Sequence, residues 1–190
     1  MWARVKLKID WSDIAYTLAA ATRGGDVTAL QASLEQYWSP KGDAIACFSV
    51  RSGFDLLLQA MMDDDALAEG DEVLFSALNV KQMVRAVERL GLVPVPVDLD
   101  LADMSPRMDA AEKAVTDRSK VFIVAHLFGA RLDLAPSAAF AKQHGLLLVE
   151  DCAQAYDGAA NRGSDLADVA MFSFRTIKTK TCPPFFHHEG

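Results

Sequence analysis

The chain has 190 residues, of which 51% are hydrophobic and 24% are charged, and this composition excludes a disordered or fibrous protein. Its 26 acidic residues outnumber 19 basic ones, and the formal net charge of -7 disfavours a nucleic acid partner. Three widely spaced cysteines, Cys47, Cys152 and Cys182, fit neither a disulfide framework nor a zinc site, and we expect no metal. Because we find no signal peptide and no apolar run near the length of a membrane-spanning helix, we expect a soluble, cytoplasmic protein without a membrane partner.

The first 43 residues differ in pattern from the rest. Two stretches, 14–21 and 27–38, predict helices separated by Gly24 and Gly25, with Asp26 as the N-cap of the second helix. We interpret residues 1–43 as an N-terminal helical arm that packs on the main domain or on a partner subunit.

From residue 44 onward, short apolar runs alternate with helical patterns. The runs predict strands buried on both faces, at residues 44–50, 72–75, 92–97, 120–125, 146–149 and 169–174. The first helical pattern follows Ser52, which we take as its N-cap. Three more cover 80–90, 108–115 and 136–144. Strict alternation predicts an α/β fold with a mostly parallel sheet and helices on both faces.

In such a fold, ligands bind beyond the carboxyl ends of the strands. Neither GxGxxG nor GxxxxGK[ST] is present, which disfavours a nicotinamide-dependent enzyme and a nucleotide phosphate loop. Asp151 follows a buried run and is either a helix cap or a counter-charge for a protonated ring nitrogen. Lys178, after another strand, is either a solvated lysine or a Schiff-base lysine. His126 is either a general base or a packed, hydrogen-bonded histidine.

Five sequence blocks resemble, in order and spacing, the DegT/DnrJ family of pyridoxal-phosphate-dependent sugar aminotransferases. They are GDEV (70–73), GLVPVPVD (91–98), HLFG (126–129), EDCAQA (150–155) and FSFRTIK (172–178). The resemblance implies the large domain of the aspartate-aminotransferase fold of type I PLP enzymes, here incomplete at the C-terminus. Residues 44–182 would form this partial PLP-binding domain, and 183–190, with two prolines, would form an off-pattern tail.

The resemblance also implies residue roles. Lys178 stands where the family's lysine joins the cofactor, pyridoxal 5'-phosphate (PLP), covalently and then serves as the catalytic base. Asp151 stands at the pyridine nitrogen and Gln154 at the phenolic oxygen. The phosphate-holding positions correspond to Ser173 and the backbone of Gly53 and Phe54.

Two residues depart from the family's pattern. Phe54 stands where a hydroxyl residue is usual, and Val80 stands where an aromatic ring usually stacks on the cofactor. The resemblance implies transfer of an amino group from an amino acid donor to a keto-sugar nucleotide or a similar carbonyl substrate, in a homodimer. We expect low activity from these 190 residues alone. The alternative is a non-catalytic homologue with this fold that acts as a binding or assembly protein.

Overall fold

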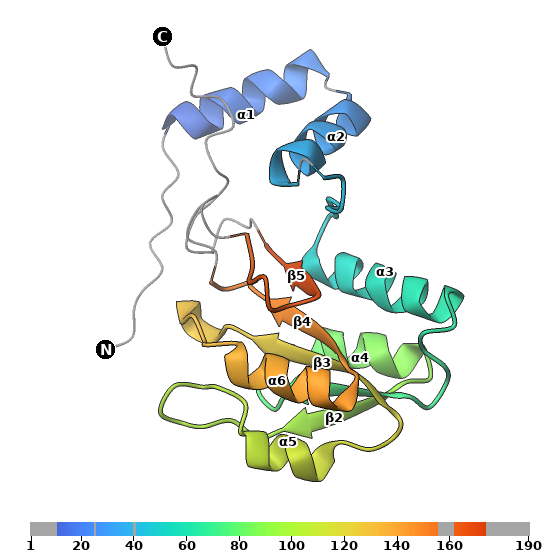
Figure 1. The fold of residues 1–190 in the computed structure, drawn as a ribbon. Coiled ribbons are helices and arrows are strands. Elements are labelled where there is room, and N and C mark those ends of the chain that lie inside the picture. The colour runs from blue at the N-terminus through green and yellow to red at the C-terminus, as the bar shows by residue number, and fades with distance from the viewer. Residues whose placement is uncertain (1–10, 25, 40, 156–161, 174–190) are drawn as a thin grey trace.

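A single parallel sheet forms the centre of the computed structural model, which describes residues 11–24, 26–39, 41–155 and 162–173 (Figure 1). Its strands are β1 (Glu72–Ser76), β2 (Val93–Val97), β3 (Ser119–Ala125), β4 (Leu147–Asp151) and β5 (Val169–Met171). They lie in the order β2-β1-β3-β4-β5, and every neighbouring pair is parallel. The predicted parallel α/β fold is confirmed.

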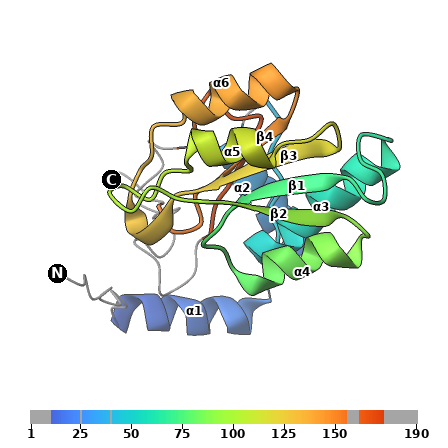
Figure 2. The same cartoon turned by 90° about the horizontal axis from the view of Figure 1, so that it is seen from below.

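Helices cover both faces of the sheet (Figure 2). On one face, α3 (Val50–Asp63) and α4 (Lys81–Arg89) pack through a cluster that includes Phe54, Leu58 and Val87. On the other face, α5 (Met108–Ala114) and α6 (Ala135–His144) pack through a second cluster, with Ala111, Phe122 and Phe140 among its members. Below we call these the α3 face and the α6 face.

Successive residues of a strand point to opposite faces, which divides the end of β4 between the two clusters. Val149 belongs to the α3-face cluster and Leu148 to the α6-face cluster. The same alternation assigns Asp151 to the α3 face and Glu150 to the α6 face. Two adjacent carboxylates therefore serve opposite sides of the sheet.

The first predicted strand, at 44–50, is wrong, because this segment does not join the sheet. Its backbone is bonded by side chains of α2 (Val27–Trp38) instead: Ala46 N–H donates to Glu35 Oε1 at 2.8 Å, and Ala46 C=O accepts from Gln31 Nε2 at 3.3 Å. Phe48 is 99% exposed, so the run is apolar without being buried. The apolar composition predicted a strand in the sheet, but the backbone N–H and C=O of Ala46 are bonded by side chains of α2 instead of by a neighbouring strand.

The predicted N-cap of α3 is also wrong. Ser49, not Ser52, has the extended backbone of a cap, and its Oγ accepts from Ser52 N–H at 3.1 Å. The helix therefore begins at Val50, and Ser52 lies inside its first turn. The last predicted strand ends at Met171 rather than at residue 174, which itself lies outside the described residues.

The N-terminal arm contains the two predicted helices, α1 (Trp11–Arg23) and α2, and Asp26 caps α2 by accepting from Thr28 N–H at 3.0 Å. The ring of Trp38 packs 4.9 Å from that of Phe172 just after β5. Arg162 donates to Trp38 C=O at 2.7 Å, which ties the end of α2 to the loop before β5. The division at residue 43 stays a prediction, and the predicted tail 183–190 lies outside the described residues.

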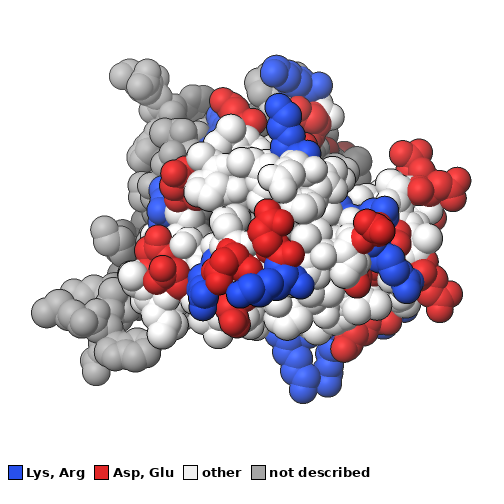
Figure 3. Space-filling view, turned by 60° about the horizontal axis from the view of Figure 1, so that its bottom comes forward, with Lys and Arg blue, Asp and Glu red and all other residues white. Residues whose placement is uncertain are grey.

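The surface carries both signs of charge. Figure 3 shows acidic and basic side chains interspersed on one face rather than gathered by sign. On α5, for example, Asp109 pairs with Arg107 at 2.7 Å and with Lys113 at 3.6 Å. Within the described ranges, the helices are too short or too polar to cross a membrane.

Candidate active site

Most of the predicted site residues follow the carboxyl ends of strands, as parallel topology requires. Asp151 is the last residue of β4 and is paired in register with Met171, two residues before Ser173. Val80 lies beyond β1, as the N-cap of α4, and is 47% exposed. The predicted catalytic Lys178 lies outside the described residues, so its role stays a prediction.

The N-terminus of α3 reaches this edge as well, because α3 leads back into β1 (Figure 1). The Oγ atoms of Ser49 and Ser52 lie 2.9 Å apart there. Gly53 N–H donates to Ser49 C=O at 3.0 Å, so this donor is part of the helix. A helix N-terminus with hydroxyl groups attracts anions through its N–H groups and dipole. Sequence reasoning missed Ser49, although an S-x-x-S spacing could have pointed to it.

Phe54 does not present its side chain to this edge. The ring is fully buried and meets the Phe75 ring in an edge-on arrangement, with 6.1 Å between centroids. The side chain therefore belongs to the α3-face core, and the departure from the family's hydroxyl residue is a packing feature.

Asp151 is a buried carboxylate on the α3 face. Its Oδ1 accepts from Ala153 N–H at 2.9 Å, which turns the chain after β4 and fixes the carboxylate. Both interpretations from sequence therefore remain compatible with the position: the carboxylate bonds the following turn, and it lies at the edge where a ring nitrogen would need a counter-charge.

Gln154 is oriented by a loop from the neighbouring strand. Its Oε1 accepts from Phe128 N–H at 3.1 Å. This bond holds the carboxamide oxygen at that loop, and the NH₂ group is the hydrogen-bond donor of the side chain. The sequence could not have shown the contact with Phe128, which joins residues 26 positions apart.

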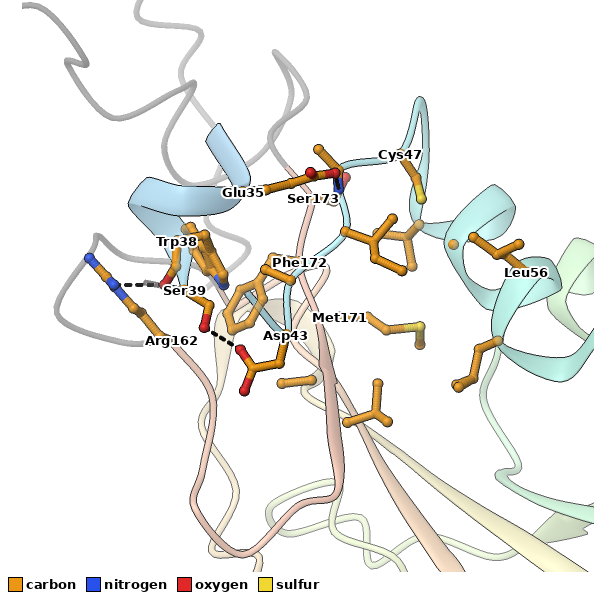
Figure 4. A pocket seen from close by; sticks show the side chains of 18 of the residues that line it. Glu35, Trp38, Ser39, Asp43, Cys47, Leu56, Arg162, Met171, Phe172 and Ser173 are labelled. Carbon is orange, nitrogen blue, oxygen red and sulfur yellow. Dashed lines mark hydrogen bonds between the residues drawn. The ribbon is translucent and has the colours of Figure 1, made fainter. Parts of the chain in front are cut away.

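A cavity of about 1030 Å³ opens between α2, the 44–50 segment, α3 and β5 (Figure 4). Gly53, Ser49 and Ser173 line it, together with the Trp38 and Phe172 rings. Phe54, Val80, Asp151 and Gln154 are not among its lining residues. The structure thus brings Gly53 and Ser173 to one cavity and places the other described site residues around the same sheet edge.

The residues present fit PLP by the chemistry of their donors. The first turn of α3 offers hydroxyl groups and a helix dipole for a phosphate. Asp151 offers a carboxylate for a pyridinium nitrogen, and Gln154 offers an amide donor for a phenolate. The buried position of Asp151 favours a cationic partner, because a buried carboxylate gains most from one.

Of the two interpretations of His126, the structure supports the packed, hydrogen-bonded histidine rather than the general base. It is buried, and its Nε2 lies 2.7 Å from Glu150 Oε1. It follows Ala125 at the end of β3, so alternation places it on the α6 face with Glu150. It is therefore a packed, hydrogen-bonded histidine on the face opposite to Asp151.

A parallel sheet covered on both faces, with a helix N-terminus and an acid at the carboxyl ends of its strands, agrees with the large domain of type I PLP enzymes. The model of the DegT/DnrJ/EryC1/StrS aminotransferase family matches residues 13–183, and the chain belongs to this family. The resemblance seen in the sequence is confirmed, and so, for the family, are the aminotransferase class and the cofactor PLP.

Known relatives agree with this assignment. A "pleiotropic regulatory protein" of Geobacillus stearothermophilus is 34% identical over 158 residues, which are 82% of this chain and 41% of that protein. DesV of S. venezuelae, solved in complex with a ketimine intermediate, is 26% identical with a TM-score of 0.71, covering 93% of this chain and 49% of DesV. A putative sugar aminotransferase of Streptococcus pneumoniae, solved in its PLP form, shares the fold at 21% identity and a TM-score of 0.69, over 94% of this chain and 50% of that one. The chain spans about half the length of these relatives or less.

Proposed function

We propose that this chain is the cofactor-binding part of a PLP-dependent aminotransferase that moves an amino group from an amino acid to a keto-sugar nucleotide or a similar carbonyl compound. The observation that carries the proposal is the buried carboxylate of Asp151 at the carboxyl end of β4, with the N-terminus of α3 at the same sheet edge. Membership of the family supports the reaction class.

Each residue has a defined task in this proposal. PLP supplies an electron sink for the carbanion chemistry of amino acids. The N-terminal turn of α3 and Ser173 bind its phosphate, Asp151 holds a proton on its ring nitrogen by charge, and Gln154 donates to its phenolic oxygen. Lys178 would be the residue that joins the cofactor and serves as base for the substrate proton. Gly53 would leave room at the phosphate, and Val80 would offer the ring an aliphatic side chain.

We further propose a cytoplasmic location and a homodimeric assembly. Cys47 and Cys152 are free thiols, which fits a reducing compartment. The arm helices α1 and α2 carry exposed apolar side chains, including Trp11 and Leu30, which would suit contact with a partner subunit.

The test is a spectrophotometric titration of the purified chain with PLP. We expect a visible absorption band that Lys178→Ala abolishes and the matched control Lys180→Ala leaves in place. Asp151→Asn, which preserves size, should weaken PLP binding in the same titration, because the ring nitrogen loses its counter-charge. A band of equal strength in both lysine variants would contradict the assignment. We expect the 190 residues alone to show little turnover, because positioning groups from the remaining length of the relatives would be absent.

A second candidate is a non-catalytic homologue that binds or assembles. The name of the Geobacillus relative, a regulatory protein, favours it. Binding of PLP without turnover in any form of the protein would favour this candidate.

A further inference from the structure

A buried polar cluster lies on the α6 face, behind the sheet edge that carries Asp151. It consists of His126, Glu150 and Cys152, which are 3%, 5% and 4% exposed. None of the roles proposed above uses these three side chains. Buried ionisable groups are costly unless they are fully bonded, so the bonds of this cluster show what it does.

The hydrogen bonds fix the tautomer of His126. Leu132 N–H donates to Nδ1 at 3.0 Å, so Nδ1 carries no proton. The proton of the neutral ring is therefore on Nε2, which donates to Glu150 Oε1 at 2.7 Å. Glu150 Oε2 accepts from Ser164 N–H, also at 2.7 Å.

The charges of the other two groups follow. Burial raises the pKa of Glu150, but hydrogen bonds from His126, the Ser164 N–H and Cys152 outweigh it, and the pKa lies below its usual value. Burial, and then the negative charge of Glu150, raise the pKa of Cys152 far above its usual range. The cluster is thus a carboxylate that accepts bonds from a neutral imidazole, a thiol and a backbone amide.

This arrangement speaks against a metal site. The ligand atoms of the three residues do lie within 4.8 Å of one another, close enough to suggest one. However, a metal on Nε2 would move the ring proton to Nδ1, where it would face the N–H of Leu132. Two donors would then oppose each other in a buried place, which costs a hydrogen bond.

The cluster instead holds the loop that orients Gln154. His126 bonds Leu132 at the far end of this loop, and Phe128 N–H within it bonds Gln154 Oε1. Phe128 has a left-handed backbone, with φ of 57°, which a side chain rarely adopts without support. Gly129 follows with φ of 83°. The bond from Leu132 to His126 closes the loop across these two residues.

We propose that His126 is a positioning residue: by accepting from Leu132 it fixes loop 127–132, so that Phe128 holds the carboxamide of Gln154, the proposed donor to the cofactor. Glu150 fixes the tautomer that lets His126 accept. The proposal rests on the proposed function for the role of Gln154, and it adds residues on the opposite face of the sheet to the machinery of that site.

Two conservative variants separate the two bonds of His126. In His126→Asn the amide oxygen can take the place of Nδ1 and keep the bond from Leu132, while the bond to Glu150 is lost. In His126→Gln the amide nitrogen can take the place of Nε2 and keep the bond to Glu150, while the bond from Leu132 is lost. The bond to the charged group contributes more to stability, so His126→Asn should melt at the lower temperature.

We expect the affinity for PLP, measured by tryptophan fluorescence in the folded proteins, to rank the two variants in the opposite order to their melting temperatures. His126→Gln should weaken binding about tenfold and His126→Asn less than about threefold. Without cofactor, hydrogen exchange of the Leu132 amide should be faster in His126→Gln than in His126→Asn. In a Gln154→Leu background the difference in PLP affinity should disappear, because the loop then has no side chain to orient.

Affinities that follow the order of stability would overturn the proposal, as would an undiminished difference in the Gln154→Leu background. Zinc added alone to the wild type should leave its melting temperature unchanged, and stabilisation would reassign the cluster to metal binding. If the wild type binds no PLP, the proposed function fails, while the exchange of the Leu132 amide still decides whether His126 holds the loop.

Discussion

Phe54 shows how one residue can depart from a family pattern at the site and yet be required by the core. Its ring is fully buried in the α3-face cluster and contacts the ring of Phe75. Truncating a buried phenylalanine to alanine removes its apolar contacts and leaves a cavity. We expect Phe54→Ala to lower the free energy of unfolding by about 3–5 kcal/mol.

Leu56 is a matched control on the same helix. It is 47% exposed, so Leu56→Ala should lower the free energy of unfolding by only about 1 kcal/mol. The gap of at least about 2 kcal/mol corresponds to roughly thirtyfold in the ratio of folded to unfolded chains. Urea denaturation measures both values, and equal slopes against urea would show that the unfolded states are comparable.

The same reasoning makes a prediction for the site. Because the ring of Phe54 lies in the core and does not line the cavity, Phe54→Leu should leave the dissociation constant for PLP within about twofold of the wild type. A loss of 1 kcal/mol or less in Phe54→Ala, or a large effect of Phe54→Leu on PLP affinity, would refute the assignment of this ring to the core.

Three more predictions follow from the geometry. A Cβ on Gly53 would lie 3.6 Å from Cys47 Sγ, which is an ordinary contact, so Gly53→Ala should keep or raise the melting temperature. It should nevertheless weaken PLP binding in a titration, because the methyl group would occupy the space proposed for the phosphate. A lowered melting temperature would contradict this. The pKa of Glu150 is depressed in the folded protein, so its carboxylate stabilises the fold at pH values above its ordinary pKa of 4.5, and this stability is lost as the pH falls through the lower folded pKa. The difference in unfolding free energy between wild type and Glu150→Gln, measured by urea denaturation, should therefore shrink well below pH 4.5. A difference that stays constant with pH would argue against this. Arg162→Ala removes the hydrogen bond to Trp38 C=O and the contact of the guanidinium with the Trp38 ring at 5.8 Å. Hydrogen exchange in α2 should therefore become faster, while the free energy of unfolding falls by about 1 kcal/mol or less. Unchanged exchange would show that Arg162 does not hold α2 in place.

Local signals in the sequence determined several elements of the fold. Asp26 predicted the start of α2 by its capping side chain, and the predicted helical range 136–144 ends where α6 ends, with Gly145 following at φ of 66°. The run containing Pro94 and Pro96 was correctly predicted as a strand. It forms β2, the outermost strand of the sheet, where two residues without N–H groups are tolerated because one side of the strand has no neighbouring strand. In these cases the information lies within a few residues.

Other features depended on partners far away in the chain. The 44–50 segment has the composition of a buried strand, but side chains of α2 bond the backbone of Ala46, and the N-cap of α3 is Ser49 rather than Ser52. The cavity that Gly53 shares with Ser173 joins residues from opposite ends of the domain. No local pattern contains these contacts.

The EDCAQA block shows the division most clearly. Its sequence identified Asp151 and Gln154 as candidates through resemblance, and their positions at the carboxyl end of β4 follow from the predicted strand. Only the tertiary structure decided that Glu150 faces α6 and bonds His126, and that Phe128 from the neighbouring strand's loop orients Gln154. The physical reason is that a strand's alternation and local signals are encoded by neighbours in sequence, whereas hydrogen-bond partners across the sheet are chosen by the register of the strands.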